Sequence, residues 1–189
     1  MLPVMAGELD DRDLMGRYRD GDVAAFEALY TRHKGPLYRY YLRQGLEEAI
    51  AAELFQEVWM NIIKARDRYR PTASFSTYMY RIAHNCLIDH FRRCGRSVDV
   101  FDEGIIQVRE LRGDDADGPQ ARAMSLESRA RFSAALEALP DEQREAFVLR
   151  EETGLGLADI AAVTNVSAET AKSRLRYAVR KLRTILADE

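Results

Sequence analysis

The sequence has only two cysteines and no apolar run near the ~20 residues that cross a bilayer. Cys86 and Cys94 form neither a disulfide framework nor an obvious zinc site. On one helix they would lie two turns apart, roughly 12 Å, too far for a disulfide. The opening residues, MLPVMAGELDDRD, also lack the basic start and apolar stretch of a signal peptide. We therefore expect a cytoplasmic protein with no membrane insertion and no structural disulfides.

Signs of catalysis and of β-structure are also missing. No stretch shows convincing strand alternation, and no nucleophile–base–acid set, Walker loop or carboxylate pair stands out. With 189 residues, 47% hydrophobic and 31% charged, the chain suits one medium or two small globular domains. We expect an all-α protein that is not an enzyme and has no cofactor.

Helical periodicity is present throughout the first half. It predicts a short helix at 14–18 that ends at Asp20-Gly21-Asp22, and a longer helix capped by Asp22, bent at Pro36 and closed by Gly45. A third helix is expected at 47–68 and a fourth at 75–94, separated by a break at 69–74. The apolar half of the third helix consists of Leu54, Phe55, Val58, Trp59, Ile62 and Ile63.

Composition changes sharply after the fourth helix. Residues 98–120, VDVFDEGIIQVRELRGDDADGPQ, hold seven acidic residues, three glycines and a proline. Such composition is typical of a flexible linker. The pattern predicts two small helical domains, 1–97 and 124–189, joined by a flexible acidic linker at 98–123.

The last part of the chain is basic, although the whole protein has a net charge of −3. A helix from about 124 carries Phe132, Leu136 and Leu139 and ends at Pro140. Asp141 is expected to cap the next helix, which ends at Gly154. A short small-residue helix then leads into the turn 164–166, where Asn165 tolerates the left-handed conformation.

Beyond that turn Ser167 is expected to cap a basic helix, with Ala171, Leu175, Ala178 and Leu182 on its inner side. This arrangement predicts a helix-turn-helix whose second helix reads DNA, because exposed cations can reach phosphates and guanine edges. A helical hairpin with a merely solvated basic face is the plainer alternative.

Several motifs, in order, resemble a known family. They are ELFQEVW at 53–59, FSTYMYRIAHN at 75–85, LIDHFRR at 87–93 and LPDEQR at 139–144. Residues 10–96 resemble region 2 of bacterial sigma factors and 124–187 resemble region 4, with no intervening region 3. This short form is similar to extracytoplasmic-function (group IV) sigma factors, which direct RNA polymerase to promoters and assist melting.

The resemblance implies three contact surfaces. The third helix would dock on the β′ clamp of core RNA polymerase through its polar half: Glu53, Gln56, Glu57, Asn61 and Lys64. The fourth helix and the loop before it would contact the −10 element and hold a flipped base through Tyr69, Ser74, Tyr78, Arg81, Asn85, Asp89, Arg92 and Arg93. Tyr80 and Ile82 of that helix are expected to pack inside.

The closing helix would contact the −35 element through Ser167, Thr170, Lys172, Ser173, Arg174, Arg176, Tyr177 and Arg180. The resemblance also implies a contact with the polymerase β flap and control by an anti-sigma factor.

Two other interpretations are open. The chain could be a helix-turn-helix regulator that acts without entering the polymerase holoenzyme, although its first half resembles no receiver or ligand-binding domain. It could also bind a metal, because Cys86, His90 and Cys94 recur every four residues. The outer two are too far apart for one ion on a straight helix, so we expect no metal site.

Overall fold

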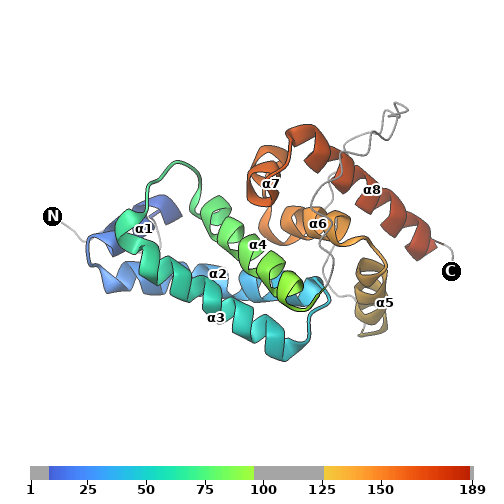
Figure 1. Ribbon diagram of the computed structural model, residues 1–189, viewed down its shortest axis with the longest axis horizontal. Coiled ribbons are helices and arrows are strands. Elements are labelled where there is room, and N and C mark those ends of the chain that lie inside the picture. Colours follow the sequence, from blue (N-terminus) through green and yellow to red (C-terminus); the bar gives the residue numbers. More distant parts are fainter. Residues whose placement is uncertain (1–8, 96–125, 188–189) are drawn as a thin grey trace.

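The computed structural model describes residues 9–95 and 126–187 (Figure 1). The first domain contains α1 (Asp11–Arg19), α2 (Val23–Arg43), α3 (Glu48–Ala65), the 3-10 turn η1 (Arg66–Arg68) and α4 (Phe75–Arg93). The second contains α5 (Leu126–Glu137), α6 (Asp141–Thr153), α7 (Leu157–Thr164) and α8 (Ala168–Ala187). Neither described range contains a strand, so the predicted all-α class is confirmed. The predicted linker lies outside the described residues.

Local sequence signals set most helix ends. The side chains of Asp22 and Ser74 accept hydrogen bonds from the amides of Ala25 and Thr77, at 3.3 and 3.0 Å. Gly45 and Gly154 adopt φ of +74° and +68°, which glycine reaches without steric cost. Asn165 adopts φ of +55°. Ser167 Oγ accepts from the Thr170 amide at 3.0 Å, as the predicted cap requires.

Four local predictions need correction. The first helix is longer than expected, because Asp10 caps it through the Asp13 amide at 2.7 Å. The third ends at 65 and continues as η1. Asp141 is the first residue of α6 and not its cap, since its carboxylate bonds to Arg144. Ile63, expected on the apolar side, is 37% exposed.

The first domain encloses an aromatic core. Tyr40, Tyr41 and Tyr80 are among its largest buried side chains, and Tyr40 meets the other two rings edge-on at 5.1 and 5.4 Å. A second group surrounds Trp59, with Phe26, Tyr30 and Phe55 at 5.0–6.4 Å. Helix α2 continues through Pro36 and carries residues of both groups. Ile82 packs partly buried against the core, as expected.

The second domain has a smaller core and a buried arginine. Arg144 is 5% exposed, and its guanidinium donates to the backbone oxygens of Leu136, Glu137 and Leu139 at 2.8–2.9 Å. These carbonyls belong to the end of α5 and the turn after it, so one side chain holds α5 against α6. Burial of a cation is tolerable here because each donor group has an oxygen partner.

The two domains pack directly on each other. Helix α7 lies against α4, and α6 lies against α2 (Figure 1). The buried cluster of the first domain continues into α6 and α7. A separate cluster joins α5 to the outer part of α8 through Ala135, Leu136, Leu139, Ala178 and Leu182. The described structure is therefore a closed arrangement of both domains.

Candidate nucleic-acid and polymerase interfaces

One face of α4 forms an exposed stripe. Tyr78, Arg81, Asn85, Asp89 and Arg92 follow one another at spacings of three or four residues, which places them on one helical face. All but the half-buried Tyr78 are exposed. Arg92 lies 3.6 Å from Asp89. The stripe combines cations, an amide and an aromatic ring, the groups that contact phosphates and bases.

A different face of α4 is engaged by the second domain. Thr77 Oγ1 donates to Asp159 Oδ1 of α7 at 2.9 Å, and His84 Nδ1 lies 2.8 Å from Glu145 Oε1 of α6. Thr77 and His84 are seven residues apart and flank the buried Tyr80. The stripe on α4 is thus left uncovered in the closed arrangement.

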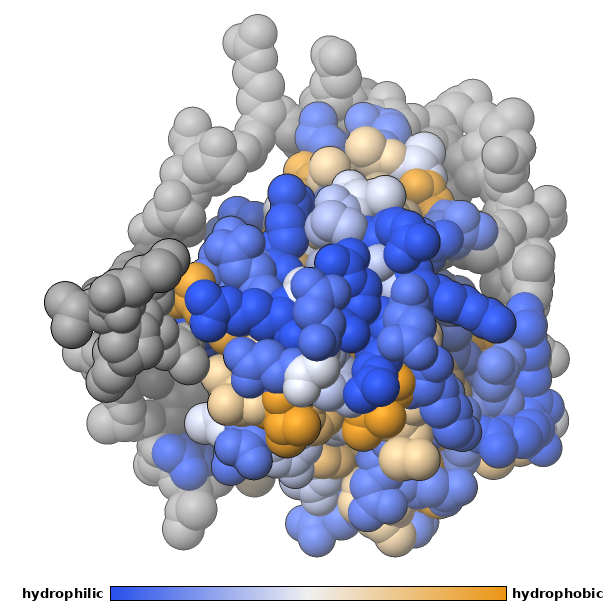
Figure 2. All heavy atoms as spheres, turned by 90° about the vertical axis from the view of Figure 1, so that its left-hand side faces the viewer, coloured by the Kyte–Doolittle hydropathy of each residue, from blue (hydrophilic) through white to orange (hydrophobic). Residues whose placement is uncertain are grey.

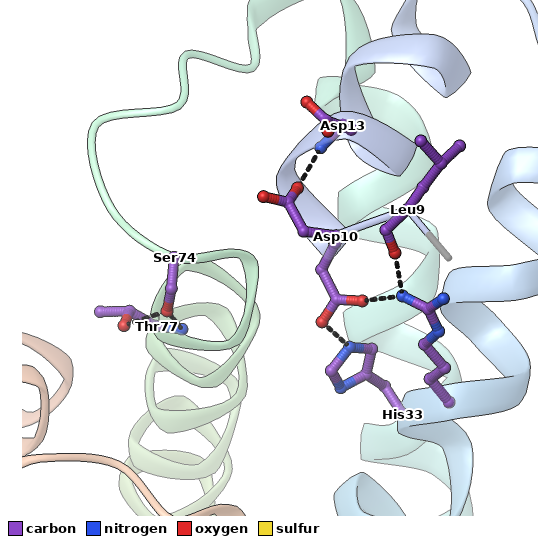
Figure 3. Close-up of polar contacts among 8 residues, drawn as sticks. Leu9, Asp10, Asp13, His33, Ser74 and Thr77 are labelled. Atoms are coloured by element: carbon purple, nitrogen blue, oxygen red, sulfur yellow. Dashed lines mark hydrogen bonds and ion pairs between the residues drawn. The ribbon is translucent and has the colours of Figure 1, made fainter. Parts of the chain in front are cut away.

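The loop before α4 is ordered around two tyrosines. Tyr69 and Tyr78 meet edge-to-face at 5.2 Å. Tyr69 is only 3% exposed, so its ring is not free to stack on a base in this arrangement. Ser74 caps α4 and contacts the Thr77 hydroxyl at 2.7 Å (Figure 3). Of these two tyrosines, the half-buried Tyr78 at the start of α4 is the better placed for stacking.

The second half of the helix-turn-helix presents a mixed basic face. Lys172 and Arg180 are exposed, whereas Ser173, Arg176 and Tyr177 are half-buried. The Arg176 guanidinium lies over the Tyr177 ring at 5.3 Å. The exposed N-terminal turn of α8 carries Ser167 and the half-buried Thr170, whose hydroxyls are 2.8 Å apart. This end of the helix can enter a major groove.

Arg174 differs from these neighbours. Burial lowers the pKa of its guanidinium, and the negative charges of Glu142 and Glu145 on α6 oppose that shift. Its side chain therefore lies toward α6. The sequence grouped Arg174 with Arg176 as equal candidates, and the structure separates them.

The predicted polymerase face of α3 divides into two parts. Glu53, Gln56 and Lys64 are exposed, together with the apolar Met60 and Ile63. Glu57 and Asn61 are half-buried against α4: Glu57 lies 4.0 Å from Arg93, and Asn61 Nδ2 donates to Cys86 Sγ at 3.7 Å. The exposed part is a polar stripe with a small apolar centre, as partner helices commonly contact.

The two cysteines differ in solvent exposure. Cys86 is buried, and burial raises the pKa of its thiol to about 11, with the charge of Glu57 adding to the shift. Cys94 is exposed, with its sulfur 3.7 Å from His90 Nε2. Among the described residues, no group of three His, Cys, Asp or Glu side chains is arranged to hold a metal ion. Nor does any helix in these ranges have the length and apolarity to cross a membrane.

Sequence reasoning missed the residue at the centre of the domain interface. Glu145 is 6% exposed. Its carboxylate accepts a hydrogen bond from the Tyr40 hydroxyl at 2.6 Å and also contacts His84. Arg39 and Arg43 of α2 approach Glu152 at 2.8 and 3.4 Å at the rim. A glutamate on a helix with many charges gives no signal of burial, because its partners are far away in the sequence.

Comparisons with known proteins cover both domains. Residues 29–97 match the family Sigma-70 region 2, and 129–182 match Sigma-70, region 4. RNA polymerase sigma factor CarQ of Myxococcus xanthus is 31% identical over 176 residues, which covers 92% of this chain and 96% of CarQ. The ECF RNA polymerase sigma-E factor of Escherichia coli K12 is 29% identical over 178 residues, 90% of this chain and 91% of that protein.

Two solved structures have a similar arrangement. CnrH, in complex with the cytosolic domain of CnrY, superposes with a TM-score of 0.69 at 25% identity, covering 95% of this chain and 98% of CnrH. The sigma factor RpoE of Bartonella quintana, in complex with the anti-sigma factor NepR, gives 0.66 at 23% identity, covering 86% and 96%. The second likeness is of fold alone.

Proposed function

Because the chain belongs to the extracytoplasmic-function group of the sigma-70 family and is a promoter-specificity subunit of RNA polymerase, we propose which of its surfaces perform each part of that role. The family match extends over both halves, so a helix-turn-helix regulator acting outside the polymerase is not favoured. The proposed domains are 1–97 for the −10 element and the clamp, and 124–189 for the −35 element. The chain itself catalyses no reaction and acts in the cytoplasm.

The exposed stripe of α4 contacts the −10 element. Asn85 reads a base edge, Arg81 and Arg92 contact phosphates, and Tyr78 stacks on an unpaired base. Tyr69 packs against the Tyr78 ring and positions it, because the two rings are in contact and only Tyr78 is accessible. Ser74 fixes the start of α4 and so positions the loop. The observation that carries this assignment is the accessibility of the stripe while a different face of α4 is engaged by α6 and α7.

The N-terminal half of α8 contacts the −35 element in a major groove. Arg176 and Lys172 are the proposed principal contacts, with Ser173, Tyr177 and Arg180 beside them. The exposed stripe Glu53, Gln56, Met60 and Ile63 of α3 docks on the β′ clamp, with Lys64 at its end. The β flap is the partner proposed for the second domain.

An anti-sigma factor is the proposed regulator. CnrH and the Bartonella RpoE were each solved with a protein partner, and the latter is named as an anti-sigma factor. In the closed arrangement of this chain, a continuous apolar cluster and several hydrogen bonds join the two domains. A partner that contacts both domains could therefore stabilise the closed state.

Reconstituted transcription tests the proposal. The full chain with core polymerase should initiate on genomic fragments at mapped starts that share two upstream motifs. Glu53→Lys with Gln56→Ala should weaken holoenzyme assembly, whereas Glu27→Lys, at an exposed site on α2, should not. Assembly that is unaffected by the α3 double change would show that this stripe does not dock on the clamp.

A further inference from the structure

A cavity of about 480 Å³ lies between α1 and the loop before α4. Its walls are formed by Leu9, Arg12, Asp13, Gly16, Arg17 and Arg19 on one side, and by Tyr69 and Pro71 on the other. The volume falls within the range of about 300–1,000 Å³ that small-molecule sites occupy. None of the α1 residues has been assigned to a DNA contact above.

Three of the eight lining residues are arginines, and one is an aspartate. Arg19 is paired with Asp20 at 3.0 Å. Arg12 and Arg17 are exposed, and within the described part of the chain neither has an ion-pair partner. Asp11, which could have neutralised them, is instead held by Arg32 and His33 of α2, at 2.8 and 2.7 Å. One carboxylate, Asp13, remains beside two unpaired guanidinium groups.

The opposite wall holds a buried polar atom without a partner. The Tyr69 hydroxyl is buried and makes no hydrogen bond to the described residues. Burial raises the pKa of this hydroxyl, and the positive charge of Arg12 opposes that shift, so Arg12 lies near it. An unsatisfied buried hydroxyl costs free energy, which a ligand oxygen could recover. Two guanidinium groups and a hydroxyl donor around one hollow are suited to a phosphate group.

The position in the fold indicates which phosphate. Pro71 and Tyr69 belong to the same loop that is proposed to hold an unpaired base. Figure 1 places α1 at the end of the molecule far from α5 and α8. Figure 2, which views that end, shows a mostly hydrophilic face. A DNA strand whose base is held on the α4 side of the loop must continue across the loop. In the direction away from the second domain, the strand then reaches α1.

We propose that Arg12 and Arg17 of α1, with the Tyr69 hydroxyl, bind a backbone phosphate of the unpaired promoter strand downstream of the captured base. This inference rests on the proposed function of the loop and extends it to a helix outside the base-reading stripe. The contact is independent of sequence and holds the strand open once melting has begun.

The test uses holoenzyme and a forked DNA template in which one strand of the −10 segment has no complementary strand. A contact to one phosphate of a single strand contributes roughly 0.7 to the slope of log affinity against log salt. Arg12→Ala with Arg17→Ala should therefore reduce the magnitude of that slope by roughly 0.7 and weaken binding equally for all −10 sequences. Arg129→Ala, at an exposed position on α5, should leave the slope unchanged.

Other variants separate the possible outcomes. Asn85→Ala should relax the −10 sequence preference without changing the slope, so it tests the proposed function and not the pocket. Tyr69→Phe should preserve thermal stability and weaken forked-template binding. An unchanged slope in the double arginine variant would overturn the proposal. A second result would also overturn it: inorganic pyrophosphate stabilises the wild-type chain but not the double arginine variant, while the two bind DNA equally. The site would then bind a free anion and not the DNA strand.

Discussion

The two domains achieve stability by different means. In the first, large aromatic side chains from α2, α3 and α4 fill a continuous core. In the second, much of the inner surface consists of small residues, and its two apolar clusters are separate. One of those clusters is continuous with the core of the first domain, and the other joins α5 and α8, with Phe147 of α6 packed against it. The buried Arg144 connects the helix that bridges these clusters to α5.

From this difference we expect the first domain to keep its fold when the domains separate, whereas the second depends more on polar bonds and on contact with the first. Burial of apolar side chains contributes ~25 cal/mol per Å² and does not require exact partners. A buried cation contributes only while its acceptors stay in place. When the domains separate, the second should therefore become the more dynamic of the two.

The largest effect is expected for Arg144→Ala. The change removes hydrogen bonds to three carbonyls of the α5–α6 turn and to Gln44 O of the first domain. Hydrogen bonds to charged groups contribute about 1.5–3 kcal/mol each, so the second domain should lose at least about 3 kcal/mol of stability. Hydrogen exchange resolved by peptide should show fast exchange in α5 and α6 and unchanged protection in α2 and α3.

Arg144→Lys keeps the charge but cannot reach several carbonyls at once, so it should rescue only part of the loss. Equal loss of protection in both domains would contradict the comparison, since it would make the first domain dependent on the second.

Glu145→Ala should loosen the closed arrangement. The Tyr40 hydroxyl, fully buried, and His84 would lose their shared acceptor, at a cost of about 1–3 kcal/mol in the closed state. Small-angle scattering of the full chain should show a larger radius of gyration. Arg39→Ala removes an ion pair in which Arg39 is half exposed and should change closure by less than about 1 kcal/mol. If both variants stay equally compact, apolar contacts hold the domains together and the polar bonds are incidental.

Two arginines on α8 should separate the DNA-reading surface from the core of the second domain. Arg176→Ala should cost about 1–3 kcal/mol at a cognate −35 site and little at unrelated sequences, if it makes a bidentate base contact. Arg174→Ala should lower the stability of the second domain and leave sequence preference unchanged, because Arg174 lies toward the acids of α6. Competition binding with cognate and scrambled duplexes, beside thermal unfolding, distinguishes the two. The reverse result would place Arg174 on the DNA.

The smallest effect concerns acid stability of the first domain. The close contact with His33, aided by Arg32, holds the pKa of Asp11 below its ordinary value of 3.8, although burial opposes this. A lowered folded-state pKa stabilises the fold above the unfolded value, and the contribution disappears as pH falls through the folded value. Wild type should therefore lose stability below about pH 4 by slightly more than Asp11→Asn does. Denaturant unfolding across that range would measure it, and parallel curves would show that Asp11 contributes nothing.

Local chemistry made much of this structure predictable. Asp22, Asn165, Ser167 and Gly154 are correctly predicted because a cap or a left-handed turn depends on a few adjacent residues. Asp141 is wrongly predicted as a cap because its carboxylate pairs with Arg144, whose burial depends on carbonyls of the α5 end and of Gln44. Ile63 was assigned to the core by helical phase alone, which is insensitive to where a neighbouring helix ends.

The candidate site was less predictable for the same reason. The residues of the stripe on α4 are among those that the resemblance implies, and Arg81, Asn85, Asp89 and Arg92 are exposed. The burial of Tyr69, the separation of Arg174 from Arg176 and the interface role of Glu145 all depend on packing between elements far apart in the chain. Arg12 and Arg17 belong to no recognisable sequence motif, and only the fold places them beside the loop before α4.

The aromatic group around Trp59 has a consequence for experiment. Trp59 is the only tryptophan, so the intrinsic fluorescence of the chain comes chiefly from one indole. That indole is 5% exposed and its ring nitrogen has no hydrogen-bond partner in the described structure, yet the next residue along α3, Met60, is 49% exposed on the proposed docking stripe. A partner docked on the stripe would contact Met60, beside the indole, and so change the packing around the Trp59 ring. Emission from the unlabelled protein should therefore follow holoenzyme assembly in stopped-flow time, with no dye attached and no residue replaced.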